Sequence, residues 1–319
     1  MVWHTCLPAL IELPLTQQHM TSPLDSRAAT EQIINAVSQQ NFPASTLYVM
    51  ATPIGNIGDI SLRALHVLSL VDAVACEDTR NTGSLLTQYG LSKSLIAAHQ
   101  HNEREVADRL IARLQAGERI ALVSDAGTPG ISDPGARIVD AVLSAGLRVL
   151  PLPGASAAIA ALSASGLVND RFHFVGFLPA RSAQRNSALH ALVGQAATMV
   201  FYEAPHRIQE TISALVNAFE PARRIVIARE LTKLFEEVHR CPLSEAKEWM
   251  AANKNHTKGE FVLLLEGAPA TSDNQNVEAE RILAILLEDL PISQAVMLAA
   301  RITGQKKNLL YERALLRKD

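Results

Sequence analysis

From residue 46 onward, short apolar segments alternate with segments that have helical periodicity. The first five apolar segments lie near residues 46–51, 71–76, 94–98, 119–124 and 147–152. Between two of them, residues 107–114 carry apolar side chains at i, i+3, i+4 and i+7, which is the spacing of one helix face. Alternation of strands and helices predicts a parallel sheet covered by helices on both faces. No other feature restricts the fold of this part of the chain as strongly.

The pattern changes after about residue 168. Further strand-like segments lie near residues 171–177, 198–202, 224–228, 235–239 and 260–265, with a helix expected near 182–193. Some of these segments are close enough in the chain to pair antiparallel. The sequence therefore predicts an α/β fold with two α/β domains, a parallel sheet followed by a mixed sheet. The cleft between the two domains is the expected active site.

Four parts of the chain follow from these patterns. They are a flexible N-terminal extension (1–45), a first α/β domain (46–168), a second α/β domain (169–268) and a helical C-terminal tail (277–319). Met20 is the expected true start, with residues 1–19 as an upstream extension. Turns at Leu290-Pro291 and Thr303-Gly304 divide the tail into about three helices.

Composition narrows the class of protein. The three cysteines are far apart in the sequence, so they indicate neither a disulfide framework nor a metal site, and a reducing cytoplasm is expected. Residues 149–169 are uncharged, but Pro151, Pro153 and Gly154 interrupt them, which favours a buried strand, turn and helix over a membrane span. The net charge of −3 argues mildly against a nucleic-acid partner, although such binding depends on local basic patches.

A loop rich in glycine and proline follows the apolar segment Ile120–Val123. It begins at Asp125 and contains Gly127, Pro129, Gly130, Pro134 and Gly135. Open α/β sheets bind ligands beyond the carboxyl ends of their strands. Glycine lets the backbone approach a ligand closely, and proline holds a loop in shape. An ordinary strand-to-helix connection is the simpler interpretation of one such loop.

Three other strand ends carry comparable segments, which favours a ligand-binding rim. These are Tyr48–Asn56, Glu77–Arg80 and Val149–Ala158. The chain contains neither GxxxxGK[ST] nor GxGxxG. Their absence argues against a P-loop NTPase and against a standard dinucleotide-binding fold.

Ten short motifs follow one another along the chain: Thr52-Pro-Ile-Gly-Asn56, Glu77-Asp-Thr-Arg80, His101-Asn-Glu103, Ser124-Asp-Ala-Gly-Thr-Pro129, Ser132-Asp-Pro-Gly135, Pro151-Leu-Pro-Gly154, Phe201-Tyr-Glu203, His206-Arg207, Ala228-Arg-Glu-Leu-Thr-Lys233 and Lys258-Gly-Glu260. Their order and spacing resemble the tetrapyrrole methylase superfamily, and within it the branch that methylates small-subunit ribosomal RNA. The resemblance runs from about Ser45 to the C-terminus.

The resemblance implies an enzyme that uses S-adenosylmethionine to methylate the ribose 2′-hydroxyl of a cytidine in small-subunit rRNA. The residues that it implies for the cofactor pocket are Pro53, Asp125, Gly127, Thr128, Ser156, Ala157, Tyr202, Glu203, Arg229 and Gly259. It implies free rRNA or the small ribosomal subunit as partner, and a homodimer. No membrane partner and no metal are expected.

A base near the acceptor oxygen would help the reaction, because a neutral hydroxyl is a weak nucleophile. Asp78 and His101 are the first candidates, and the other polar groups expected at the rim are Glu77, Arg80, Asn102 and Asp133. For each single residue, a helix cap, an ion pair or a loop hydrogen bond is the stronger expectation. Five basic residues are expected to contact RNA: Arg80, Arg181, Arg207, Lys306 and Lys307.

Two other functions remain open on the sequence. A tetrapyrrole (uroporphyrinogen or precorrin) C-methyltransferase would have the same fold, but we expect it to lack the helical tail. A non-catalytic ribosome-assembly factor would bind cofactor or RNA without turnover. The basic end of the tail is equally consistent with a solvated helix face or a dimer contact.

Overall fold

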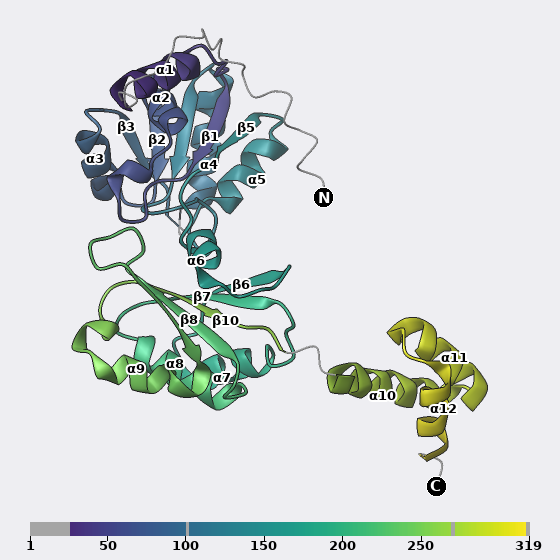
Figure 1. Ribbon diagram of the computed structural model, residues 1–319. Coiled ribbons are helices and arrows are strands. Elements are labelled where there is room, and N and C mark those ends of the chain that lie inside the picture. Colours follow the sequence, from purple (N-terminus) through teal and green to yellow (C-terminus); the bar gives the residue numbers. More distant parts are fainter. Residues whose placement is uncertain (1–25, 100–101, 269–271, 317–319) are drawn as a thin grey trace, which may run out of the picture.

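The first half of the chain folds around a parallel five-stranded sheet (Figure 1). The computed structural model describes residues 26–99, 102–268 and 272–316. The elements of this first unit are α1 (Ser26–Ser38), β1 (Thr46–Met50), α2 (Leu62–Leu70), β2 (Ala73–Cys76), α3 (Thr79–Gln88), β3 (Ser94–Ala97), α4 (Glu103–Gln115), β4 (Arg119–Val123), α5 (Ala136–Ser144) and β5 (Arg148–Leu152). The strand order is β3-β2-β4-β1-β5, and all neighbours are parallel. The parallel sheet predicted from the alternation is confirmed.

Helices bury both faces of this sheet. Leu47 of β1 packs with residues of α4 and α5, whereas its neighbour Tyr48 packs with residues of α2 and α3 on the opposite face. Side chains alternate between the two faces of a strand, so strands buried on both faces have continuous apolar sequences. All five carboxyl ends lie at one edge of the sheet because the strands are parallel.

Residues 26–45 are ordered around helix α1. This helix contacts α2, and the Tyr48 hydroxyl donates a hydrogen bond of 2.8 Å to the Pro43 carbonyl. Part of the segment predicted as a flexible extension is therefore a helix attached to the first unit. Met20 and the proposed upstream extension lie outside the described residues.

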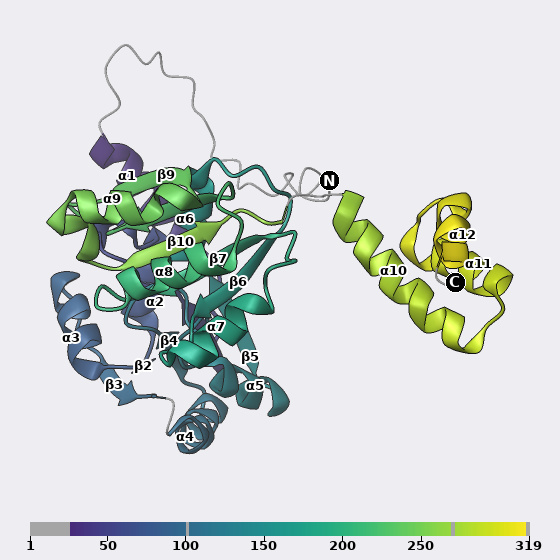
Figure 2. The same ribbon diagram turned by 90° about the horizontal axis from the view of Figure 1, so that it is seen from below.

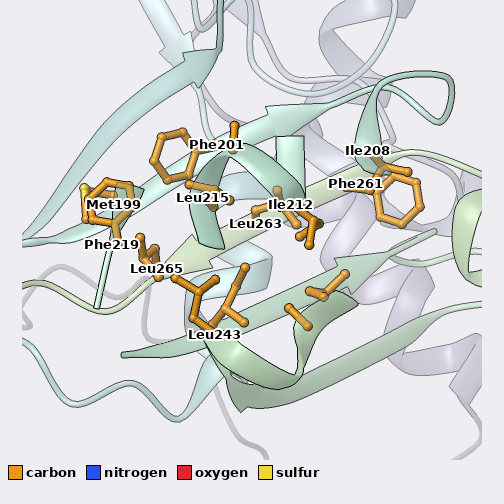
Figure 3. Packing of buried hydrophobic residues seen from close by; sticks show 14 of the residues in the cluster. Met199, Phe201, Ile208, Ile212, Leu215, Phe219, Leu243, Phe261, Leu263 and Leu265 are labelled. Atoms are coloured by element: carbon orange, nitrogen blue, oxygen red, sulfur yellow. The ribbon is translucent and has the colours of Figure 1, made fainter. Parts of the chain in front are cut away.

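The second half forms a mixed five-stranded sheet, as predicted. The elements of this second unit are α6 (Ala157–Ser165), β6 (Phe172–Phe177), α7 (Ser182–His190), β7 (Thr198–Glu203), α8 (Ile208–Ala218), β8 (Arg224–Arg229), β9 (Glu237–Pro242), α9 (Ala246–Ala252) and β10 (Phe261–Leu265). The strand order is β6-β7-β10-β8-β9, in which only the β6–β7 pair is parallel. Apolar side chains of α8, β7 and β10 pack together on the face of this sheet that α7, α8 and α9 cover (Figure 3).

Helix α6 covers the inner face of this second sheet and lies between the two units (Figure 1). Ala158 and Ala161 of α6 are buried against β7, β8 and β10. Alanine side chains let a helix pack close to a sheet. Ile54 of the first unit, which is partly buried, packs against the same apolar cluster, so this cluster joins the two units.

One predicted strand begins later than expected. The sequence predicts a strand near residues 235–239, but β9 starts at Glu237. Leu234 and Phe235 are 90% and 67% exposed in the loop before it. The sequence pattern alone does not separate this exposed apolar pair from the start of a strand that is itself mostly not buried.

Three helices end the described chain: α10 (Ser272–Asp289), α11 (Ile292–Thr303) and α12 (Lys307–Leu316). They pack on one another around a core of their own that includes Leu283, Val296 and Leu310, and Figure 2 shows them as a group beside the two units. We call this group the tail. None of the described helices is long and apolar enough to cross a membrane.

Candidate functional site

Three Gly/Pro motifs that are far apart in the sequence are joined by hydrogen bonds. Thr52 and Gly127 exchange backbone hydrogen bonds of 2.9 and 3.0 Å, and the Thr52 hydroxyl donates to the Ser124 carbonyl. The Thr128 hydroxyl donates to the Ala155 carbonyl at 3.1 Å. Gly127 has φ +80°, a conformation that glycine adopts without strain. The loops after β1, β4 and β5 therefore form one preformed surface.

This surface is one wall of a cavity of about 290 Å³. Residues of both units and the start of α6 line it: Ile54, Ala126, Gly127, Thr128, Ile131, Ser132, Asp133, Ser156, Ala157, Phe177, Tyr202, Glu203, Ala204, Pro205, Glu230, Leu231, Lys233, Glu260, Phe261 and Val262. Apolar side chains and a few polar groups are the usual lining of a small-molecule site.

The residues predicted for a cofactor pocket gather at this cavity. Those that line it are Gly127, Thr128, Ser156, Ala157, Tyr202 and Glu203. The remaining ones, Pro53, Asp125, Arg229 and Gly259, are each one position before a lining residue.

Asp125 and Arg229 have structural partners next to the cavity. The Asp125 carboxylate accepts hydrogen bonds from the Asp78 backbone at 3.1 Å and from the Asn81 side chain at 2.7 Å. It therefore joins the loop after β4 to the start of α3. The Arg229 guanidinium pairs with Glu237 at 3.0 Å and so ties β8 to β9.

A charged cluster closes the second unit's side of the cavity. The Lys233 ammonium pairs with Glu230 at 2.9 Å and with Glu260 at 2.8 Å. Burial disfavours the charge on Glu230, but the Glu260 N–H and the Lys233 ammonium outweigh it and lower the pKa of Glu230. A Cβ on Gly259 would lie 2.4 Å from Glu230 Cγ, so only glycine leaves room for this carboxylate.

The same cluster contacts the first unit. A Cβ on Gly55 would lie 2.4 Å from Lys233 Cγ, so the loop after β1 packs directly on this lysine. We did not predict Lys233, Glu230 or Glu260 as site residues. All three belong to the quoted motifs, but the left-handed conformation of Glu230, with φ +51°, is invisible in the sequence.

Tyr202 connects the second sheet to helix α6. Its hydroxyl accepts a hydrogen bond of 3.2 Å from the Ala158 N–H in the first turn of α6. Phe174 and Phe177 contact its ring edge-on, with centroids 5.1 and 5.7 Å away. Burial raises the pKa of Tyr202. This tyrosine therefore lies neutral in the wall of the cavity.

Glu203 is held by its own neighbours. Its carboxylate is fully buried, accepts a hydrogen bond of 2.6 Å from the Thr211 hydroxyl and lies 3.2 Å from Arg207 Nε. Arg207 also donates to the Leu178 carbonyl. Glu203 and Arg207 thus orient the chain between β7 and α8, and Arg207 is a poor candidate for contact with RNA.

The residues predicted as catalytic occupy structural positions where they are described. The Asp78 carboxylate caps α3 by accepting the Arg80 N–H at 2.8 Å. Hydrogen bonds from Arg80 lower the pKa of Asp78 to about 2, which makes it a weak base. Asn102 hydrogen-bonds to the backbone of His99 and Ala97. His101 lies outside the described residues.

Asp133 is the acidic residue of this edge that lines the cavity. Burial, together with the nearby negative charges of Glu77 and Asp125, raises its pKa to about 6. A hydrogen bond with Ser124 has the opposite effect and lowers the pKa. Burial also raises the pKa of Glu77, which does not line the cavity. Neither effect is visible in the sequence, because burial and the approach of separate loops cause both.

The other predicted RNA contacts differ in exposure. Arg181, Lys306 and Lys307 are exposed. Arg80 is exposed too, but its guanidinium pairs with Asp78 at 2.7 Å. In the described part of the chain, no group of three or more His, Cys, Asp or Glu residues is placed to hold a metal ion.

Residues 46–247 match the family model of the tetrapyrrole (corrin/porphyrin) methylases. The chain belongs to this family. The resemblance inferred from the motifs is therefore confirmed. Residues 273–318, which cover the tail, match the model of a C-terminal helix-turn-helix domain named RsmI_C.

Curated relatives align with this methylase over nearly their full length. Proteins named ribosomal RNA small subunit methyltransferase I from Pseudomonas aeruginosa and Escherichia coli O157:H7 are 51% and 49% identical to it. The alignments cover 86% and 84% of this chain, and 98% and 94% of the relatives.

Solved structures of low sequence identity share the fold. The methyltransferase CobJ aligns with a TM-score of 0.53 at 19% identity, over 70% of this chain and 94% of its own. A uroporphyrin-III C-methyltransferase from Thermus thermophilus aligns with a TM-score of 0.51 at 19% identity, over the same shares. These likenesses support the two-sheet architecture alone.

Proposed function

We propose that this methylase transfers a methyl group from S-adenosylmethionine to the ribose 2′-hydroxyl of a cytidine in small-subunit rRNA. The observation that carries the proposal is the 51% identity to a ribosomal RNA small subunit methyltransferase I over 98% of that relative. The finer assignment to a cytidine and to its 2′-oxygen rests on the motif resemblance. The chain would act in the cytoplasm, where ribosomes are assembled, and we expect a homodimer because symmetric dimers are the commonest soluble oligomers.

The cavity suits S-adenosylmethionine in size and in lining. At about 290 Å³ it is close to the lower end of the range for small-molecule pockets, roughly 300–1,000 Å³. Ile54, Leu231 and Val262 offer apolar contact for an adenosine. The first turn of α6 can attract a carboxylate, since helix N-termini favour negative charge.

The cofactor contributes a methyl group bound to positively charged sulfur. Gly127, Thr128, Ser156 and Ala157 would hold it through backbone and hydroxyl groups, with Tyr202 of the second unit beside the start of α6. Positioning of this kind supplies a large part of the acceleration in many two-substrate reactions. Arg181 and the exposed lysines Lys306 and Lys307 are the basic groups that we retain for contact with RNA phosphates.

The test uses methyl-labelled S-adenosylmethionine and three acceptors: small ribosomal subunits, free small-subunit rRNA and uroporphyrinogen. We expect label on a cytidine 2′-oxygen, located by mapping the labelled nucleotide. The better RNA acceptor shows when in assembly the enzyme acts. Label on uroporphyrinogen alone would replace the RNA function with the tetrapyrrole one. Tight cofactor binding without label on any acceptor would favour the non-catalytic assembly factor.

A further inference from the structure

The four carboxylates that line the cavity differ in what neutralises them. They are Asp133, Glu203, Glu230 and Glu260. Glu203 lies against Arg207 and accepts a hydrogen bond from Thr211. Glu230 and Glu260 share the Lys233 ammonium. In the part of the chain that the structure describes, no cation is among the groups that act on Asp133.

The loop that carries Asp133 is held rigidly. Ser132, the preceding residue, has φ +67°, a strained conformation for a non-glycine residue that is often found at functional sites. Pro134, the following residue, restricts the backbone of Asp133 to extended conformations. The Gly135 N–H donates to the buried Glu103 carboxylate at 2.7 Å. The backbone that carries Asp133 at the cavity is therefore restricted on both sides of this residue.

The charged and titratable groups around Asp133 come from several elements. Glu77 follows β2 and Asp125 follows β4, and both disfavour a negative charge on Asp133. Tyr202 of β7 interacts with it from the second unit. A carboxyl with a pKa near 6 is charged at neutral pH and is a stronger base than an ordinary aspartate, which suits proton transfer. Asp78 has the opposite character, because Arg80 stabilises its charge.

We propose that Asp133 is the catalytic base, which accepts the proton of the acceptor hydroxyl. This inference rests on the proposed function. The acceptor oxygen forms a bond to the methyl carbon, the carbon–sulfur bond breaks, and its electron pair stays on sulfur. The hydroxyl proton passes to a carboxylate oxygen of Asp133 and later to solvent. The sulfonium becomes a neutral thioether, so atoms and charge balance.

The test compares full-length Asp133→Asn, Asp133→Glu and the control Asp140→Asn. Asp140 is exposed on α5, so the control makes the same chemical change a short distance along the chain. Single-turnover methylation of the best RNA acceptor is measured from pH 5 to 9. Calorimetry with S-adenosylmethionine measures cofactor binding independently of activity.

For the wild type we expect the rate to fall as pH drops below about 6, because a protonated Asp133 cannot accept a proton. Asp133→Asn should lower the rate by about 10²–10⁴-fold, the usual contribution of a general base. The inflection near pH 6 should disappear, while cofactor affinity stays within threefold. Asp133→Glu should retain the inflection and part of the rate, and Asp140→Asn should behave as wild type.

Two results would overturn the inference while the proposed function stands. One is an Asp133→Asn rate within threefold of wild type with the inflection unchanged. The other is a loss of cofactor affinity that accounts for the whole rate defect, which would make Asp133 a binding residue. If the wild type labels no RNA at all, the proposed function fails, and the role of Asp133 fails with it.

Discussion

Asp78 and Asp133 lie at the same edge of one sheet, yet their pKa values move in opposite directions. Hydrogen bonds from Arg80 lower that of Asp78 to about 2. Burial and two neighbouring carboxylates raise that of Asp133 to about 6. The two residues have the same side chain, and both lie in loops that lead from a strand of this sheet to the next helix. The immediate surroundings of each carboxyl therefore decide which one can exchange a proton near neutral pH.

Asp133→Asn should stabilise the fold at neutral and alkaline pH. The pKa of Asp133 is raised from 3.8 to about 6 on folding, so its charged form is disfavoured in the folded state. This destabilisation of the folded state is absent at pH values below the pKa of Asp133 in the unfolded chain. It is complete at pH values above the pKa in the folded protein. We expect a gain of about 1–2 kcal/mol at pH 8, less than the full shift implies because the group is partly exposed.

Thermal unfolding of wild type and Asp133→Asn at pH 8 and pH 4 measures this effect. The gain should shrink towards zero at pH 4, and Asp140→Asn should change stability little at either pH. A loss of stability at pH 8 would contradict the prediction and would mean that the Asp133 charge is favourably bound.

Gly259→Ala should destabilise the protein and weaken cofactor binding. Gly259 has φ +89°, and a Cβ there would lie 2.4 Å from Glu230 Cγ. The strained backbone and the displaced Glu230 should together cost about 1–3 kcal/mol. Chemical denaturation and calorimetry with S-adenosylmethionine measure the two effects.

Alanine variants of two other glycines are controls that separate the effect of backbone strain from the effect of steric contact. Gly117→Ala tests backbone strain alone, because Gly117 has φ +97° and no atom within 4 Å of its added Cβ. Gly194→Ala has neither problem and should be nearly neutral. If Gly259→Ala lowers the free energy of unfolding no more than Gly117→Ala does, the contact with Glu230 contributes nothing to the destabilisation.

At the scale of elements, helix α6 links the two halves of the site. Its first turn donates the Ala158 N–H to Tyr202, and its alanines pack on the inner face of the second sheet. The helix begins just after Ala155, whose carbonyl accepts a hydrogen bond from the Thr128 hydroxyl. A shift of α6 would therefore move residues on both walls of the cavity.

Ala161→Leu should push α6 away from the sheet. Ala161 is fully buried, and overpacking of this kind typically costs about 1–3 kcal/mol. Ala164→Leu on the same helix is the control, because Ala164 is exposed. Denaturation should show a loss for Ala161→Leu alone, accompanied by weaker cofactor binding. Equal stability of the two variants would show that the α6 interface can repack.

At the scale of the whole molecule, the tail is the part with a separate core. Its helices pack on one another, and Lys306 and Lys307 are exposed near the start of α12. The net charge of the chain is −3, so electrostatic attraction to RNA must come from local groups such as these.

The double variant Lys306→Ala/Lys307→Ala should bind small-subunit rRNA more weakly and with less salt dependence. For each lysine that pairs with a phosphate, its removal should reduce the slope of log K against log[salt] by about one. Titrations at several salt concentrations measure the slope, and cofactor affinity should be unchanged. Lys247→Ala/Lys254→Ala, also exposed, is the matched control. An identical slope in both double variants would argue that the tail has another role.

Much of this architecture could be predicted from the sequence, for local physical reasons. Continuous apolar strands such as Ile120–Val123 indicate burial on both faces, and the Gly/Pro loops mark the strand ends. The family resemblance implied ten residues for the cofactor pocket, and six of them line the cavity. Four of the six, Gly127, Thr128, Ser156 and Ala157, follow strands of the parallel sheet, whose carboxyl ends share one edge.

Only the tertiary structure decided which side chains are free to act. Burial and the charges of Glu77 and Asp125 raise the pKa of Asp133. Lys233 lies against Gly55, across the boundary between the units. Arg207 turns inward to Glu203. Local sequence determines backbone shape and apolar periodicity, whereas charge, solvation and partner depend on residues that are distant in the chain and meet only on folding.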